Sequence, residues 1–212
     1  MDQEKKSSKY VAVAGNIGAG KSSLTGLLAK HFNWEAFYES VDDNPYLQDF
    51  YEDMRRWSFN LQIYFLSSRF RHQKEMLNDD INLIQDRTIY EDVEIFAKNL
   101  HQMNLMSDRD FANYEALFEE MSYSLRPPDL LIYLRAQVPT LVKQIQQRGR
   151  DYENTIRIEY LERLNNLYED WIGRYPHEKL IIDTDDLDFV NNKEDLGRVI
   201  EMIEQRMFGL FN

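Results

Sequence analysis

Short apolar runs alternate with longer stretches of helical periodicity along the chain. Five apolar runs, several of them rich in β-branched and aromatic residues, predict strands: Tyr10–Ala14, Trp34–Tyr38, Asn82–Gln85, Leu130–Leu134 and Leu180–Ile182. Strands that alternate with helices form a parallel sheet covered on both faces. The carboxyl ends of such strands meet at one edge, where ligands bind. Residues just after each strand are therefore the candidates for function.

The intervening stretches carry apolar residues every three or four positions, as amphipathic helices do. We expect helices over Ser22–His31, Asp53–Leu77, Asp108–Ser124, Pro139–Gln147, Thr155–Trp171 and Lys193–Phe208. The core face of the helix at 155–171 is predicted to hold Ile158, Leu161, Leu164, Tyr168 and Ile172. In the long helix from 53 to 77, Gln62, Arg69 and His72 form a polar set beside an apolar stripe. Periodicity alone favours a solvated face for that set.

The loop after the first predicted strand contains a phosphate-binding pattern. It reads Gly-Asn-Ile-Gly-Ala-Gly-Lys-Ser and matches G-x-x-x-x-G-K-[ST] between a strand and a helix. Glycines let backbone N–H groups face phosphate oxygens, and the helix adds its positive N-terminal end. We expect Lys21 to reach the β- and γ-phosphates and Ser22 to contact a Mg²⁺ ion. The predicted nucleotide-binding residues are Gly15, Asn16, Ile17, Gly18, Ala19, Gly20, Lys21, Ser22 and Ser23.

Charged residues follow other predicted strands. Glu39 comes after the second strand, Asp86-Arg87-Thr88 after the third, and residues 183–186, which are rich in Asp, after the fifth. We expect Glu39 and Asp86 to lie above the phosphate loop, whereas the last group fits a helix cap. Arg148 and Arg150 flank a glycine after a helix, which is typical of a lid that neutralises a transferred phosphoryl group. A solvated helix end is the alternative.

These features together indicate phosphoryl transfer to a small acceptor. Glu39 would accept the proton of the attacking hydroxyl, which contributes roughly 10²–10⁴ in rate. Ser22 and Asp86 would hold Mg²⁺, directly or through water. The predicted fold is α/β and P-loop NTPase-like: a five-stranded parallel sheet flanked by helices, with a short arginine-bearing lid.

Composition limits the classes of function. The 212 residues suffice for a single P-loop domain over 10–212, after a flexible tail at 1–9. A net charge of −12 argues against a general binder of nucleic acid or anionic membranes. The absence of cysteine excludes disulfides and thiol-based sites. No apolar run reaches the ~18 to 20 residues of a membrane span, and the first nine residues are polar, so we expect a cytoplasmic protein without a signal peptide.

The phosphate loop, with Asn16 and Ile17 in it, is similar to the signature of the deoxynucleoside kinase family. The resemblance extends from Val11 to about Thr184. It implies a salvage enzyme that transfers the γ-phosphate of ATP to the 5′-hydroxyl of a deoxynucleoside. It also implies Mg²⁺ as a cofactor and a homodimer as the assembly.

The resemblance assigns roles to the charged residues. Glu39 matches the family's catalytic base. Asp86-Arg87-Thr88 matches its [DE]-R-[ST] motif, in which the acidic residue supports the metal and the arginine orients the base and the 5′-hydroxyl. Arg148 and Arg150 match its lid arginines. The expected catalytic residues are thus Glu39, Arg87, Lys21, Arg148 and Arg150, and the expected metal-binding residues are Ser22 and Asp86.

The acceptor side is assigned in the same way. Tyr51 and Glu153 match a pair that holds the 3′-hydroxyl, and Gln62 matches a glutamine that makes two hydrogen bonds to the base. Arg69 and Asp92 match a pair found in members that accept deoxyadenosine, deoxyguanosine or deoxycytidine. Such a pair can donate and accept around a purine or cytosine edge, and it would crowd the methyl group of thymine. The resemblance therefore replaces the solvated-face interpretation of Gln62 and Arg69 by a functional one. Glu39 and Arg87 are expected to contact the substrate as well.

The segments 39–47 and 86–96 look like those of the bacterial deoxyadenosine/deoxyguanosine kinases, whereas Asn44 stands where the animal enzymes often have tryptophan. Deoxyadenosine is therefore the expected substrate, with deoxyguanosine or deoxycytidine as alternatives. A nucleoside monophosphate kinase is a further alternative, although Glu39 would repel an acceptor phosphate. A non-catalytic accessory subunit of respiratory complex I also resembles the family, but here Lys21, Glu39 and Arg87 occur together.

Overall fold

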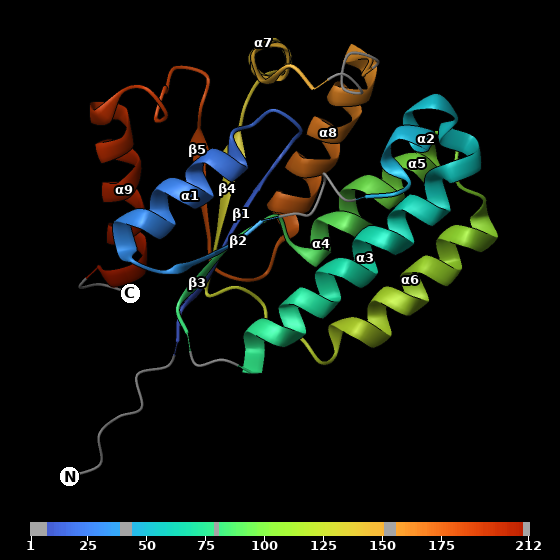
Figure 1. Cartoon of the computed structure of the whole chain (residues 1–212), viewed down its shortest axis with the longest axis horizontal. Helices are drawn as coiled ribbons and strands as arrows, with labels where there is room; N and C mark the ends of the chain where they lie inside the picture. Colours follow the sequence, from blue (N-terminus) through green and yellow to red (C-terminus); the bar gives the residue numbers. More distant parts are fainter. Residues whose placement is uncertain (1–7, 39–43, 79–80, 151–155, 210–212) are drawn as a thin grey trace.

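The computed structural model describes residues 8–38, 44–78, 81–150 and 156–209. A five-stranded sheet, parallel throughout, has the order β2-β3-β1-β4-β5 (Figure 1). Its strands are β1 (Tyr10–Gly15), β2 (Glu35–Phe37), β3 (Leu83–Asp86), β4 (Leu130–Arg135) and β5 (Lys179–Asp183). Each strand ends within one residue of its predicted bounds. The predicted fold class, a five-stranded parallel sheet flanked by helices, is confirmed.

The helices surround this sheet. They are α1 (Lys21–Phe32), α2 (Leu47–Glu52), α3 (Met54–Asn78), α4 (Ile89–Glu91), the π-helix η1 (Asp92–Ala97), α5 (Lys98–Gln102), α6 (Asp108–Ser122), α7 (Val138–Arg148), α8 (Ile158–Arg174) and α9 (Lys193–Phe208). The long amphipathic helices were predicted. The short α2 and the continuous run from α4 through η1 to α5 were not, because a single turn or a π-helical interruption has no 3.6-residue pattern to detect.

Alternate side chains of the central strand β1 serve two separate cores. Val11 and Val13 pack on one face with α1 and α9. Ala12 and Ala14 pack on the other with α8 and with Ile95 of η1. Figure 1 shows α1 and α9 on the left of the sheet and α8 to its right. Both faces of the parallel sheet are thus covered by helices, as its apolar sequence requires.

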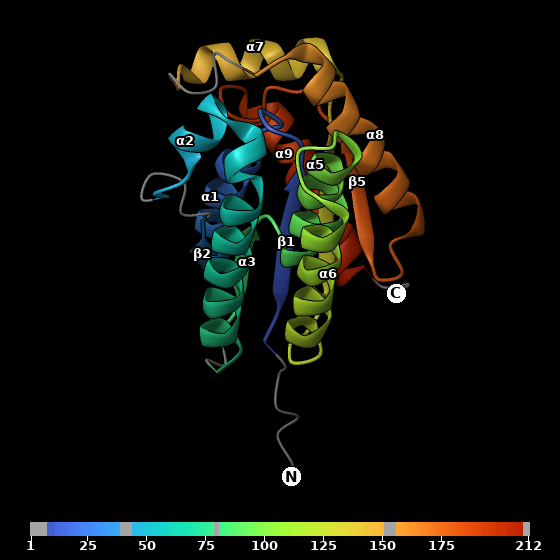
Figure 2. The ribbon, with the colours of Figure 1, turned by 90° about the vertical axis from the view of Figure 1, so that its right-hand side faces the viewer.

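A third core lies beyond the sheet. It joins α2, α3, η1, α5 and α6, and Tyr114 of α6 is fully buried in it. Figure 2 shows α3 and α6 running alongside each other. This core holds α3 against η1, and the two elements form one wall of the cleft described below.

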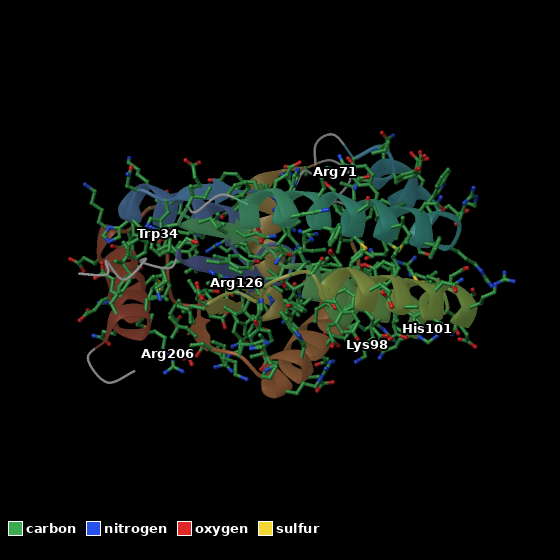
Figure 3. All side chains as sticks on the ribbon, turned by 90° about the horizontal axis from the view of Figure 1, so that it is seen from below. Trp34, Arg71, Lys98, His101, Arg126 and Arg206 are labelled. Atoms are coloured by element: carbon green, nitrogen blue, oxygen red, sulfur yellow. The ribbon has the colours of Figure 1, made fainter. Side chains whose placement is uncertain are left out.

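The first described residues, Ser8 and Lys9, are hydrogen-bonded near the amino ends of the strands. The carbonyl of Lys9 accepts a hydrogen bond from the backbone N–H of Leu83, and the carbonyl of Ser8 accepts one from Arg126, which Figure 3 labels. The predicted flexible tail spanned residues 1–9, of which 1–7 lie outside the described residues. Ser8 and Lys9 are hydrogen-bonded to the fold.

One prediction about side-chain exposure is wrong, and one interpretation that periodicity alone favoured, already replaced by the family resemblance, is not found. Ile158 was assigned to the core face of α8, but it is the first residue of that helix and is 54% exposed, whereas the other four residues of the stripe are buried. The polar set on α3 is not a solvated face, because Gln62 and Arg69 are only 3% and 5% exposed. Helix η1 packs against α3 and covers these positions, and periodicity in one helix carries no information about that partner.

The acidic group after β5 does cap a helix, although not the next one in sequence. Asp185 accepts hydrogen bonds from the backbone N–H of Gln137, at 2.9 Å, and from the hydroxyl of Thr140 at the start of α7. Asp183 instead forms a bidentate ion pair with Arg135 at the end of β4. Hydrogen bonding to Arg135 holds the pKa of the Asp183 carboxyl below its ordinary value.

Candidate active site

A cleft opens where the carboxyl ends of the strands meet. It encloses about 870 Å³, including the solvent at its mouth, which is the size of a small-molecule site. The predicted site residues that line it are Ile17, Lys21, Ser22, Tyr51, Gln62, Asp86, Arg87, Asp92, Arg148 and Arg150. Residues from the phosphate loop, α2, α3, β3, η1 and α7 therefore meet in one place. Glu39 and Glu153 lie outside the described residues.

The phosphate loop needs its glycines for close contacts as well as for its backbone conformation. Gly18 and Gly20 have φ values of +85° and +91°. A Cβ atom on Gly18 would lie 2.8 Å from the carbonyl oxygen of Leu141 in α7, and one on Gly20 would lie 2.9 Å from the ring of Phe189. Any larger residue would push α7 or Phe189 away. The loop is therefore held between α7 and Phe189.

Asn16 holds the loop from within. Its side chain accepts a hydrogen bond from the N–H of Ile17 at 2.7 Å and donates to the carbonyl of Leu161 at 3.0 Å and to Asn165 at 2.6 Å. The ammonium group of Lys21 donates to the Asn16 carbonyl at 2.9 Å. Asn16 does not line the cleft, and its side chain ties the loop to α8. Five other predicted nucleotide-binding residues also do not line it, namely Gly15, Gly18, Ala19, Gly20 and Ser23.

The pair expected to hold Mg²⁺ fits such an ion. The hydroxyl of Ser22 donates to Oδ2 of Asp86. The other oxygen of this buried carboxylate, Oδ1, has no hydrogen-bond partner among the described residues. An unpaired buried carboxylate oxygen is costly, and a cation in the cleft would satisfy it. Hydroxyl and carboxylate oxygens are ligands that Mg²⁺ prefers, usually together with water and substrate phosphates. In the described part of the chain, no group of three or more His, Asp or Glu side chains is arranged so that it could hold a metal ion by itself.

Arg87 occupies an unusual position directly after Asp86. Its φ is +68°, a conformation that costs a residue other than glycine about 1–2 kcal/mol. Its backbone N–H is bonded to the carbonyl of Val13 at 2.9 Å, which fixes the turn beside β1. Its guanidinium lies 4.3 Å from the centre of the Phe96 ring and donates to the hydroxyl of Tyr168 at 3.2 Å. The surroundings thus hold both the backbone and the charged group of Arg87.

The acceptor side is built around a buried ion pair. Arg69 forms two hydrogen bonds to Asp92, at 2.7 and 2.9 Å, and the side chains are 5% and 2% exposed. Asp92 lines the cleft, whereas Arg69 lies behind it and lines a smaller pocket with Ser68 and His72. The side-chain oxygen of Gln62 is buried and has no hydrogen-bond partner within the described ranges. It is therefore ready to accept a hydrogen bond from a ligand.

An apolar wall completes the cleft, and its function was not predicted. It consists of Leu47, Phe50, Leu61, Phe65, Phe96 and Tyr160. Burial raises the pKa of the Tyr160 phenol to about 12, although the charge of Arg87 opposes this, so the phenol is neutral at physiological pH. Sequence patterns assigned Leu61 and Phe65 to the apolar stripe of a helix. The sequence did offer one indication that they line the cleft: Leu61 directly precedes Gln62, and Phe65 follows it by about one helical turn.

The two predicted lid arginines lie at the end of α7. Arg148 is its last residue, and Arg150 follows Gly149, which ends the helix with a φ of +68°. Both side chains line the cleft. The residues that follow them, 151–155, lie outside the described residues. A lid function is therefore not tested by this geometry.

A phosphate loop on the central strand, a lysine, a hydroxyl–carboxylate pair and several arginines around one cleft define a P-loop phosphotransferase. Comparison with known proteins is more specific. The model of the family described as "Deoxynucleoside kinase" matches residues 11–207. The chain belongs to this family, and the predicted family and its kinase activity are confirmed.

Relatives of similar length support this assignment. The chain is 41% identical to a deoxyadenosine/deoxycytidine kinase of Bacillus subtilis, over 91% of this chain and 90% of the relative. It is also 41% identical to a deoxyguanosine kinase of Lactobacillus johnsonii, over 93% and 92% of the two chains.

Solved structures show the same fold. A deoxyadenosine kinase of M. mycoides with bound dATP superposes with a TM-score of 0.82 at 31% identity, covering 92% of this chain and 99% of the other. The same enzyme with the products dCMP and dCDP bound gives a TM-score of 0.83 at 32% identity, with the same coverage. Among the described residues, no helix combines the length and apolar composition needed to cross a membrane.

Proposed function

We propose that this deoxynucleoside kinase transfers the γ-phosphate of ATP to the 5′-hydroxyl of deoxyadenosine in nucleoside salvage. The observation that carries the choice of base is the buried pair of Arg69 and Asp92 together with the side-chain oxygen of Gln62, which has no hydrogen-bond partner among the described residues. Asp92 and the Gln62 oxygen are both hydrogen-bond acceptors on the cleft side. They suit the exocyclic amino group of adenine and mismatch the carbonyl that thymine presents at the corresponding position.

Deoxycytidine and deoxyguanosine are the second candidates, because cytosine carries an amino group at the position that corresponds to that of adenine, and guanine carries one at C2. The relatives support this order only in part, since they include a deoxyadenosine/deoxycytidine kinase and a deoxyguanosine kinase. The apolar wall formed by Leu61, Phe65 and Phe96 suits the faces of any base. The hydrogen-bonding edge therefore has to provide the discrimination.

The donor phosphates would lie along the phosphate loop, where backbone N–H groups and Lys21 neutralise their charge. Ser22 and Asp86 would hold Mg²⁺, which when bound stabilises the negative charge that develops on the phosphates. Arg148 and Arg150, as lid arginines, would neutralise the transferred phosphoryl group from the opposite side.

The acceptor hydroxyl would lie between Glu39 and the γ-phosphate. Glu39 accepts its proton as general base, and Arg87 orients both the carboxylate and the hydroxyl. Tyr51 lines the cleft and would hold the 3′-hydroxyl together with Glu153. Because the acceptor carries no phosphate, a carboxylate at this point binds it without charge repulsion.

The proposal includes the assembly and the location. A homodimer in the cytoplasm, each chain forming one kinase domain over residues 10–212, fits the family resemblance. In the single chain several apolar residues of α3, among them Trp57, Phe59 and Phe70, are only partly buried. Such residues are available to pack against a second copy.

An acceptor assay tests the proposed reaction. With ATP and Mg²⁺, the protein should phosphorylate deoxyadenosine and leave dAMP unchanged. Glu39→Gln should lower kcat about 10²–10⁴-fold while ATP binding is retained, because only the general base is lost. Phosphorylation of dAMP but not of deoxyadenosine would show a nucleoside monophosphate kinase, and an unchanged kcat in Glu39→Gln would refute the base assignment.

A further inference from the structure

The carboxylate of Glu91, in α4, joins two segments that are far apart in sequence. The side chain is 0% exposed. Its Oε2 accepts hydrogen bonds from the backbone N–H and the hydroxyl of Thr88, at 2.7 and 3.2 Å. Its Oε1 accepts one from the N–H of Gly15, the first residue of the phosphate loop, at 3.3 Å. One carboxylate therefore connects the phosphate loop to the residue that follows Arg87.

Tyr168 of α8 completes this junction from the opposite side. Its hydroxyl lies 2.7 Å from Oε1 of Glu91 and 2.8 Å from the carbonyl oxygen of Gly15, so one proton serves two acceptors. The same hydroxyl oxygen accepts a hydrogen bond from Nη1 of Arg87 at 3.2 Å. Burial raises the pKa of the phenol well above its ordinary value, which keeps it a neutral donor.

The two charged side chains at this junction of Gly15, Arg87, Thr88, Glu91 and Tyr168 are buried. Nη1 of Arg87 lies 3.8 Å from Oε1 of Glu91, and neither side chain is appreciably exposed. Glu91 and Tyr168 do not line the cleft, whereas Arg87 does. Apolar residues often stabilise a core as well as a buried ion pair does, so packing alone gives no reason for a carboxylate here. The hydrogen bonds of the Glu91 carboxylate are directional. They join the phosphate loop, at Gly15, to the Arg87 turn, at Thr88, and these two parts of the site must be aligned.

We propose that Glu91 and Tyr168 are positioning residues, which set the Arg87 guanidinium and the Arg87 turn relative to the first residue of the phosphate loop. This role rests on the proposed function of Arg87 at the acceptor hydroxyl. Phosphoryl transfer depends mainly on the alignment of donor and acceptor, and a displacement of about 1 Å can lower its rate about 10²-fold. The junction therefore acts on kcat more than on the binding of either substrate.

Glu91→Gln tests the proposal, because glutamine keeps the volume but replaces one acceptor oxygen by an amide donor. That donor must face either the N–H of Thr88 or the N–H of Gly15. We expect kcat to fall about 10–100-fold while the KM for ATP changes by less than about threefold. Tyr168→Phe should lower kcat about 3–10-fold by removing one hydrogen bond to Arg87. It also provides a second test if Glu91→Gln does not fold.

The matched control is Tyr10→Phe. Tyr10 is another buried tyrosine, but its hydroxyl donates to Gln85, at 2.6 Å, and not to Glu91. We expect this variant to lower Tm about as much as Tyr168→Phe does and to leave kcat unchanged. If Tyr168→Phe and Glu91→Gln also lower Tm but leave kcat unchanged, the proposal is overturned.

Measuring kcat in an Arg87→Lys background separates the positioning role of Glu91 from the proposed function of Arg87 on which it rests. If Glu91 acts through Arg87, Glu91→Gln should reduce kcat far less in that background than in the wild type. Fully additive losses would overturn the positioning role. If Arg87→Lys alone leaves kcat unchanged, the proposed function of Arg87 is wrong, and the positioning role is wrong with it. If Arg87→Lys lowers kcat and Glu91→Gln does not, only the positioning role is wrong.

Discussion

The proposed phosphate-binding half and the proposed base-binding half of the cleft are built in different ways. The first is one contiguous segment, residues 15–22, which leads from the end of β1 into the first turn of α1. The second takes single side chains from two elements: Gln62 from α3 and Asp92 from η1. Phosphates can be bound by the main chain of a local motif, whereas a base is selected by side chains that only tertiary packing brings together. Changes in the first half should therefore affect all acceptors equally, and changes in the second should discriminate between them.

The largest effect is expected in the phosphate-binding half. Lys21→Met removes the ammonium group from the buried end of the loop, and we expect kcat to fall by about 10²–10³ with every deoxynucleoside. Steady-state kinetics with several acceptors would measure this. Lys30→Met, at the exposed end of the same helix, is the matched control and should leave kcat unchanged. A loss with Lys21→Met that depends strongly on the base would contradict the division into two halves.

A smaller and selective effect is expected in the base-binding half. Arg69→Met removes the buried ion pair with Asp92, which should destabilise the protein by about 3–5 kcal/mol and lower kcat/KM for deoxyadenosine about 10–100-fold. The value for thymidine should change much less. Denaturant unfolding and kinetics with both acceptors measure the two effects. Arg69→Met combined with Asp92→Leu should restore stability but not the preference for deoxyadenosine. Equal losses on all bases would show that the pair is only structural.

The same difference explains what could be predicted from sequence. The bounds of the strands and the place of the phosphate loop could be predicted because both depend on local patterns, namely short apolar runs and glycines at fixed spacing. The burial of Gln62 and Arg69 depends on η1, a π-helix about thirty residues further along the chain, and the pattern of α3 alone suggested a solvated face. Only the family resemblance pointed to their function.

Arg87 and Glu91 show a second limit. Thr88 and Glu91 form a capping box, whose spacing is visible in the sequence. That spacing does not reveal the bond from Glu91 to Gly15, which spans 76 residues. The positive φ of Arg87 also could not be predicted from the sequence. Arginine has no preference for that conformation, and only the surrounding contacts impose it.

The measurement that tests the central claim most directly is kcat/KM for the four deoxynucleosides with ATP and Mg²⁺. The buried Arg69–Asp92 pair and the open acceptor on Gln62 predict that deoxyadenosine has the highest value and thymidine the lowest, since thymine presents a carbonyl and a methyl group to this edge. A kcat/KM for thymidine equal to or above that for deoxyadenosine would contradict the account.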